Sequence, residues 1–97
     1  MKLSPETLDR SASTGDVRAS FDLDGGLGGS EVEIASVRLE GVAVKRVVAV
    51  RRDDVIVEFG RSQVLAVVPN GARVPLTLSG RVRGLPCQAT DTVRVRN

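Results

Sequence analysis

The sequence contains no histidine, tryptophan or tyrosine, and one cysteine, Cys87, in 97 residues. Histidine is the commonest general base and zinc ligand, so its absence excludes Ser–His and Cys–His nucleophile pairs. A single cysteine cannot form an internal disulfide. Because Cys87 follows Pro86 in an expected turn, we interpret it as a small core or turn residue rather than a reactive thiol.

Aromatic residues and long apolar runs are also scarce. With only Phe21 and Phe59, the core must be built from Val, Leu, Ile and Ala, and the β-branched members favour strands. No stretch approaches the roughly 18 apolar residues of a membrane span, and residues 1–5 lack the apolar core of a signal peptide. The net charge of +2 is too small to indicate nucleic acid as a partner.

The sequence instead has short alternating runs separated by Gly, Pro, Asn and Asp. Pro5 cannot donate to a ladder, so it places residues 2–8 at a sheet edge or bulge. Residues 16–23 alternate apolar and polar, which predicts a half-buried strand, and the four glycines of residues 24–30 predict a loop. In residues 32–39 the apolar positions change parity, which predicts a bulge or bend.

The second half of the chain continues this pattern. Residues 42–59 predict a hairpin, and residues 60–68 have helical spacing that favours about one or two helical turns, with a continuous strand as the alternative. Residues 74–82 and 90–96 predict strands, and Arg83-Gly84 predicts a turn. The first strand of the hairpin is expected to present one apolar face, made of Val42, Val44, Val48 and Val50.

These elements together predict one all-β domain over residues 1–97. About seven short strands and one short helical turn are typical of an antiparallel two-sheet sandwich. The acidic residues fall mostly at turns or on outward positions, so no carboxylate pair for acid–base catalysis stands out. We therefore expect no enzymatic activity and no cofactor.

The chain contains, in order, the segments KLSPETL, SVRLEG, VIVEFGRSQVLAVVPNG, VPLTLSGRV and TDTVRVRN. In this order they resemble a small Ig-like β-sandwich module that recurs near the ends of multidomain secreted or surface proteins of bacteria and archaea. The resemblance covers nearly the whole chain. It implies an Ig-like fold and a non-catalytic accessory or spacer role, outside the cell, within a larger protein. A cytoplasmic location stays open.

The sequence departs from this family at two places. Many members carry an acidic D-x-D-x-DG-x-D loop that looks like a calcium site, just before the strand that matches residues 55–59. Here the corresponding residues 47–54 include Arg51 and Arg52, so the resemblance gives no support for calcium. The aspartate that usually caps the helical turn is replaced by Gly60, which lacks a side-chain acceptor.

Three groups of polar residues are candidate sites. Asp22 and Asp24 begin a calcium-loop pattern, but the further ligands are missing at the required spacing unless Glu31 or Glu33 folds back, and we interpret the segment as a glycine-rich turn. Asp91 shares parity with core valines and is expected to accept backbone hydrogen bonds at a bulge. A positive hairpin end, interpreted as a solvated tip, would consist of Lys45, Arg46, Arg51 and Arg52.

We therefore expect a non-catalytic structural or interaction module that is monomeric in isolation and packs against neighbouring domains. One alternative is a module that binds an anionic ligand, nucleic acid or acidic glycan, through the Arg-rich hairpin. A further alternative is a calcium-stabilised, adhesion-like domain.

The calcium alternative makes a direct prediction. Millimolar calcium should raise the melting temperature, measured by far-UV circular dichroism, by several degrees, because a ligand that binds only the folded state stabilises it. The double variant Asp22→Asn plus Asp24→Asn should lose that shift. A transition that calcium leaves in place would exclude this alternative.

Overall fold

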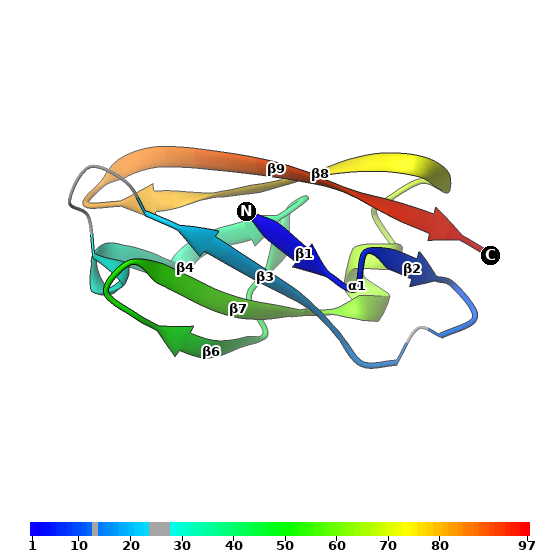
Figure 1. Cartoon of the computed structure of the whole chain (residues 1–97), viewed down its shortest axis with the longest axis horizontal. Helices are drawn as coiled ribbons and strands as arrows, with labels where there is room; N and C mark the ends of the chain where they lie inside the picture. Colours follow the sequence, from blue (N-terminus) through cyan, green and yellow to red (C-terminus); the bar gives the residue numbers. More distant parts are fainter. Residues whose placement is uncertain (13, 24–27) are drawn as a thin grey trace.

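Figure 1 shows the computed structural model of the chain, which describes residues 1–12, 14–23 and 28–97. The described residues form two sheets with nine strands in all, so the all-β prediction is confirmed. The first sheet has the order β1 (Lys2–Ser4), β3 (Asp16–Asp22), β7 (Asp54–Gly60), β6 (Arg46–Val50). The second sheet has the order β2 (Thr7–Asp9), β9 (Leu85–Arg96), β8 (Gly71–Val82), β4 (Val32–Leu39), β5 (Val42–Ala43).

The strand count exceeds the predicted seven because two runs are divided between the sheets. Pro5 has no N–H for a ladder, and at this residue the chain crosses from β1 in the first sheet to β2 in the second. Strand β2 then pairs with β9 in parallel, whereas the other strand pairs are antiparallel. The second division lies at Val44-Lys45, between β5 and β6.

The hairpin predicted over residues 42–59 was therefore too long. The hairpin consists of β6 and β7, and β5 pairs with β4 in the other sheet. The expected apolar face is confirmed for Val42 and Val44, which pack against the core, and wrong for Val48 and Val50, which are 41% and 46% exposed. Strand β6 is outermost in its sheet, and a register shift after Val47 interrupts the alternation, so these side chains have few neighbours.

Several local predictions are confirmed. Strand β4 carries an irregularity between Glu33 and Arg38, as the parity change indicated. A short helix α1 (Arg61–Leu65) follows β7 and has Gly60 as its N-cap residue without a side-chain hydrogen bond. Arg83 and Gly84 have φ values of 54° and 78°, as a tight turn between β8 and β9 requires. A 3-10 turn, η1 (Gly29–Glu31), occupies part of the predicted glycine loop, and residues 24–27 lie outside the described residues.

The core lies between the two sheets and is almost entirely aliphatic. Phe59 is fully buried, whereas Phe21 is only half-buried near one end of the sandwich. Helix α1 adds Val64 and Leu65 to the core. The other buried apolar residues are Leu3, Leu8, Val17, Ala19, Val32, Val37, Leu39, Val55, Val57, Val68, Val74, Leu76, Leu78, Val82, Val93 and Val95. No helix among the described residues is long and apolar enough to cross a membrane.

Arg10, which directly follows β2, connects the N-terminal segment of residues 1–10 to the loop after α1 through hydrogen bonds. Its guanidinium donates to the carbonyl oxygens of Leu65 and Val68 at 2.8 and 2.6 Å and to Asn70 Oδ1 at 2.5 Å. Its backbone N–H donates to the Arg96 oxygen at 2.8 Å. One residue therefore satisfies carbonyl groups at the end of the helix and holds the first segment against the last strand.

The two phenylalanines provide a test of this core. Phe59→Ala should lower the free energy of unfolding by about 3–5 kcal/mol, because it leaves a cavity in a fully buried position. Phe21→Ala, the matched control at a half-buried position, should cost less than half as much. Guanidinium chloride unfolding measures both, and equal losses would contradict this placement of the core.

Candidate functional site

A charged ladder crosses the outer face of the first sheet. Glu58 on β7 faces Arg18 on β3 and Arg46 on β6, its direct cross-strand partners. Arg18 donates to Glu58 Oε2 through Nε at 3.1 Å and Nη2 at 2.9 Å. Arg46 donates to Glu58 Oε1 through Nε at 2.9 Å and also through Nη2. Glu58 is 6% exposed, and the two guanidiniums cover its carboxylate from both sides.

The ladder continues to Asp16 at the start of β3. Lys45 Nζ lies 2.7 Å from Asp16 Oδ1, and Arg46 Nη2 lies 3.3 Å from Asp16 Oδ2. The hydrogen bond from Lys45 lowers the pKa of Asp16 below its usual value, and the nearby arginine charge adds to the effect. The hydrogen bonds from Arg46, followed by those from Arg18, lower the pKa of Glu58 in the same way. Lys45 and Arg46 are therefore neutralised by carboxylates of the same chain.

The four basic candidates do not form one patch. Arg51 and Arg52 follow the far end of β6, about 17 Å of strand from Arg46. Arg51 Nη1 lies 3.7 Å from Asp54 Oδ2, and Arg52 is exposed. The positive hairpin end expected from the sequence is therefore divided between the two ends of an edge strand, and most of its charge is paired.

The segment with the calcium candidates packs against the β6–β7 turn. Leu23 N–H donates to the Asp53 oxygen at 2.9 Å, and Gly29 N–H donates to the Arg51 oxygen at 3.1 Å. A Cβ on Gly29 would lie 2.2 Å from that oxygen, so only glycine fits here. Asp22 is exposed and opposite Asp54 in the ladder.

The two glutamates that could have completed a calcium site, Glu31 and Glu33, contact other groups. Asp24 lies outside the described residues. Glu33 Oε2 accepts the Gly84 N–H at 2.9 Å, and Glu31 Oε2 lies 3.6 Å from Arg83 Nε. Both glutamates therefore contact the β8–β9 turn. No group of three or more Cys, Asp or Glu side chains among the described residues could hold a metal ion.

Asp91 accepts backbone hydrogen bonds, as predicted, but it does not lie at a bulge, because it pairs in regular register with Leu76. Its Oδ2 accepts the Leu3 N–H of β1 at 2.9 Å, and its Oδ1 accepts the Thr92 N–H at 2.9 Å. Strand β1 belongs to the first sheet and β9 to the second, so this carboxylate bridges the two sheets at their common edge.

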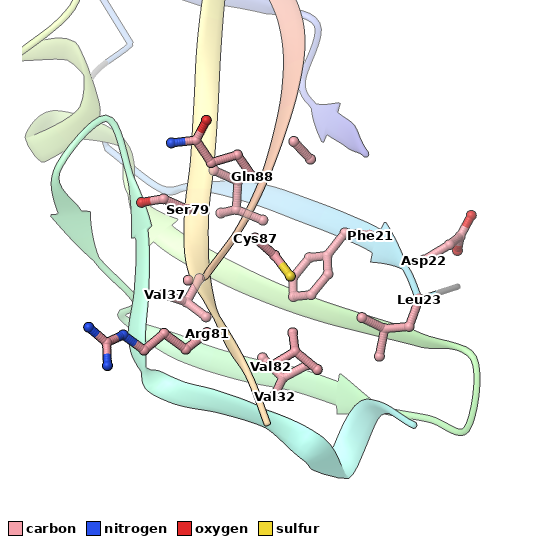
Figure 2. Close-up of a pocket in the computed structure, with 13 residues that line it drawn as sticks. Phe21, Asp22, Leu23, Val32, Val37, Ser79, Arg81, Val82, Cys87 and Gln88 are labelled. Atoms are coloured by element: carbon pink, nitrogen blue, oxygen red, sulfur yellow. The ribbon is translucent and has the colours of Figure 1, made fainter. Parts of the chain in front are cut away.

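An apolar cavity of about 250 Å³ opens between β3 and β9 at one end of the two sheets. Figure 2 shows Phe21, Leu23, Val82 and Cys87 pointing toward one another across it. Cys87 lies on β9 with an exposed side chain, so its assignment to the core or a turn is wrong. It is exposed because the hairpin of β8 and β9 has 12-residue strands and extends past the seven-residue β3.

This cavity was not predicted from the sequence. The alternation of residues 16–23 did place Phe21 on the inward face, which was the available signal, whereas Cys87 lies before the strand predicted over residues 90–96. Some inward-facing positions have no residue of the other sheet opposite them. The alignment of the two sheets decides which positions these are, and the alternation of residues within a strand does not predict that alignment.

The chain matches no protein-family model, and comparisons with curated proteins and with solved structures find no match. The chemistry of the two sites therefore has to be judged from their geometry. Glu58 is held ionised between two arginines, so it is a poor proton donor or acceptor near neutral pH. The cavity has an apolar lining with a thiol at its rim, which suits contact with apolar groups.

The Glu58 ladder predicts a pH-dependent stability. The pKa of Glu58 in the folded protein lies below its usual value of 4.5. At a pH between these two pKa values the unfolded chain binds more protons than the folded protein, so the free energy of unfolding rises with pH. The contribution is complete above about pH 5 and is lost as the pH falls through the lowered pKa. Glu58→Gln should cost about 1–3 kcal/mol at pH 7, and the gap to the wild type should narrow towards pH 3.

Glu6→Gln is the matched control, because Glu6 has a 75% exposed side chain whose only ion pair is to Lys2 among the described residues. It should change the free energy of unfolding by no more than about 0.5 kcal/mol at any pH. Urea unfolding between pH 3 and pH 7 measures both variants. A gap between Glu58→Gln and the wild type that stays constant over this range would contradict the ladder.

Proposed function

We propose that the chain is an Ig-like module that acts as a non-catalytic structural or interaction part, most simply a spacer, of an exported multidomain protein. The strand order carries this proposal. Ig-like sandwiches place strands A, B, E and D in one sheet and C, F and G in the other. The order β1-β3-β7-β6 corresponds to A-B-E-D, and β9-β8-β4 corresponds to G-F-C, with β5 in the place of the next strand, C′.

The residues at the usual core positions differ from those of antibody domains. Those domains pack a tryptophan on strand C against a disulfide between strands B and F. Here the buried residues of the corresponding strands are aliphatic: Ala19 on β3, Val37 on β4 and Leu78 on β8. The module therefore depends on aliphatic packing and needs no oxidising compartment to fold.

The arrangement of the two chain ends supports a spacer role. Strand β2 lies parallel to β9, and the two are joined by the bonds from Arg94 N–H to the Glu6 oxygen and from Arg10 N–H to the Arg96 oxygen, both 2.8 Å. Arg96 Nε also lies 3.2 Å from Asp9 Oδ2. A load applied between the chain ends acts along these strands, so it shears these bonds together rather than one after another.

The geometry does not favour the other two functions. Arg18, Lys45 and Arg46 share the carboxylates of Asp16 and Glu58, so this group has a net charge of only +1 for nucleic acid or an acidic glycan. For calcium, the described part of the chain supplies Asp22 without a group of further ligands.

Single-molecule stretching between the two ends tests the spacer role. We expect one cooperative rupture, followed by a gain in length of about 300 Å, since 97 residues extend to roughly 350 Å and the folded molecule is 41 Å long. Arg94→Pro removes the N–H donated to Glu6 and should lower the rupture force and cost about 1 kcal/mol of stability.

Arg94→Ala, the matched control, keeps this N–H and should retain most of the rupture force. Gradual extension without a rupture, or an Arg94→Pro variant as strong as Arg94→Ala, would contradict a load-bearing spacer. Specific turnover of a substrate by the purified protein would contradict a non-catalytic module.

A further inference from the structure

Two strand edges lie open beside the apolar cavity. Strand β1 pairs with β3 only as far as Ser20, so Phe21 and Asp22 have no strand on that side. Strand β2 pairs with β9 only from Arg94 onward, so residues 85–92 of β9 form ladder pairs with β8 alone, and β1 reaches them only through the bond from Leu3 to Asp91. These statements concern the described residues. The two open edges belong to different sheets and form opposite rims of the cavity.

The open part of β9 presents backbone groups for a further strand. Arg94 N–H and the Arg96 oxygen bond towards β2, so even-numbered residues of β9 direct their backbone groups away from β8. By the alternation of an antiparallel ladder, Gln88 and Thr90 do the same. Thr92 N–H is already donated to Asp91, which closes one end of this edge.

The other end of the open edge is closed by Pro86, which has no N–H. Between these two ends, residues 85–90 read LPCQAT and carry no formal charge. Free edges are commonly protected by charges, and the β6 edge shows this protection, with Lys45-Arg46 before its valines and Arg51-Arg52 after them. The β9 edge lacks that protection, so nothing repels an uncharged strand.

The size of the cavity indicates what lies against this edge. Pockets for drug-sized ligands measure about 300–1,000 Å³, and this cavity measures about 250 Å³, enough for one or two aliphatic side chains. Its rim includes Cys87 and Ala89, the inward-facing neighbours of Gln88. A strand paired with β9 would direct every second side chain to the same side as these two residues.

We propose that this groove binds an extended, uncharged segment of another protein, which adds as a strand to the free edge of β9. The segment exchanges backbone hydrogen bonds with Gln88 and Thr90, and its alternate side chains, aliphatic and of valine size, enter the cavity between Phe21 and Cys87. A second copy of this chain fits less well, since the Pro86 of each copy would leave one carbonyl of the other unpaired. The inference rests on the proposed interaction role and names its partner.

The native Cys87 reports on occupancy without any substitution. The probe is an end-blocked hexapeptide in which threonine and valine alternate, and the readout is the rate at which Cys87 reacts with a thiol-reactive disulfide reagent. A peptide bound along β9 covers this thiol, so at about ten times its dissociation constant the rate should fall about tenfold. A hexapeptide of six serines should not protect Cys87, because none of its side chains supplies apolar area to fill the cavity.

Two variants test whether the peptide binds at the β9 edge. Gln88→Pro removes an N–H that faces the free side and should abolish protection, whereas Gln88→Ala keeps that N–H and should bind as the wild type does. Thermal melting shows whether Gln88→Pro stays folded. If it does not, an alternating peptide methylated at its backbone nitrogens removes the same hydrogen bonds from the other partner and should also fail to protect.

Several results would overturn this proposal. These are no protection up to the solubility limit of the alternating peptide, equal protection by the all-serine peptide, and protection by butanol alone, which would indicate a small-molecule site. Sedimentation velocity that shows a dimer with Cys87 already protected would make a second copy the occupant. A protein that ruptures cooperatively under load but binds no peptide would lose this partner and keep its spacer role.

Discussion

Burial of aliphatic side chains between two sheets holds this protein together, because it has no disulfide and Phe59 is its only fully buried aromatic residue. Two polar contacts keep the sheets aligned at the edge where the chain begins. Asp91 accepts the Leu3 N–H across the sheets, and Arg10 joins the first segment to the loop after α1. Strand β2, which pairs in parallel with β9, lies between these two contacts in the chain, which changes sheets between Leu3 and Arg10.

The charges are arranged to be satisfied locally. Glu58 lies between Arg18 and Arg46, and Asp16 lies beside Lys45. These pairs lie on the outer face of the first sheet, where the bonds to Glu58 also join neighbouring strands. The basic residues at the two ends of β6 oppose pairing of this valine-rich edge with a second copy of the chain. If two copies of β6 paired in antiparallel fashion around Val48, Lys45 of one copy would lie opposite Arg51 of the other.

The unequal lengths of the strands connect the fold to its possible interactions. Strands β8 and β9 extend past β3, so Leu85 and Cys87 of β9 are exposed near the β8–β9 turn, whereas Val82 of β8 is buried. Phe21 and Cys87, which would be core residues in a sandwich of equal strands, here line an open cavity. An uncharged strand edge and an apolar cavity therefore occur at the same end of the molecule.

The sequence by itself determined the all-β class, the strand of residues 16–22, the irregularity in β4, the helical turn after Gly60 and the tight turn at Arg83-Gly84, because alternation, helical spacing and glycine act over a few residues. It also identified the role of Asp91 from parity. Only the tertiary structure decided where the chain changes sheets, which valines stay exposed on β6, and that Cys87 faces a cavity. These depend on how far one sheet extends over the other, a relation between residues distant in the chain that no local pattern records.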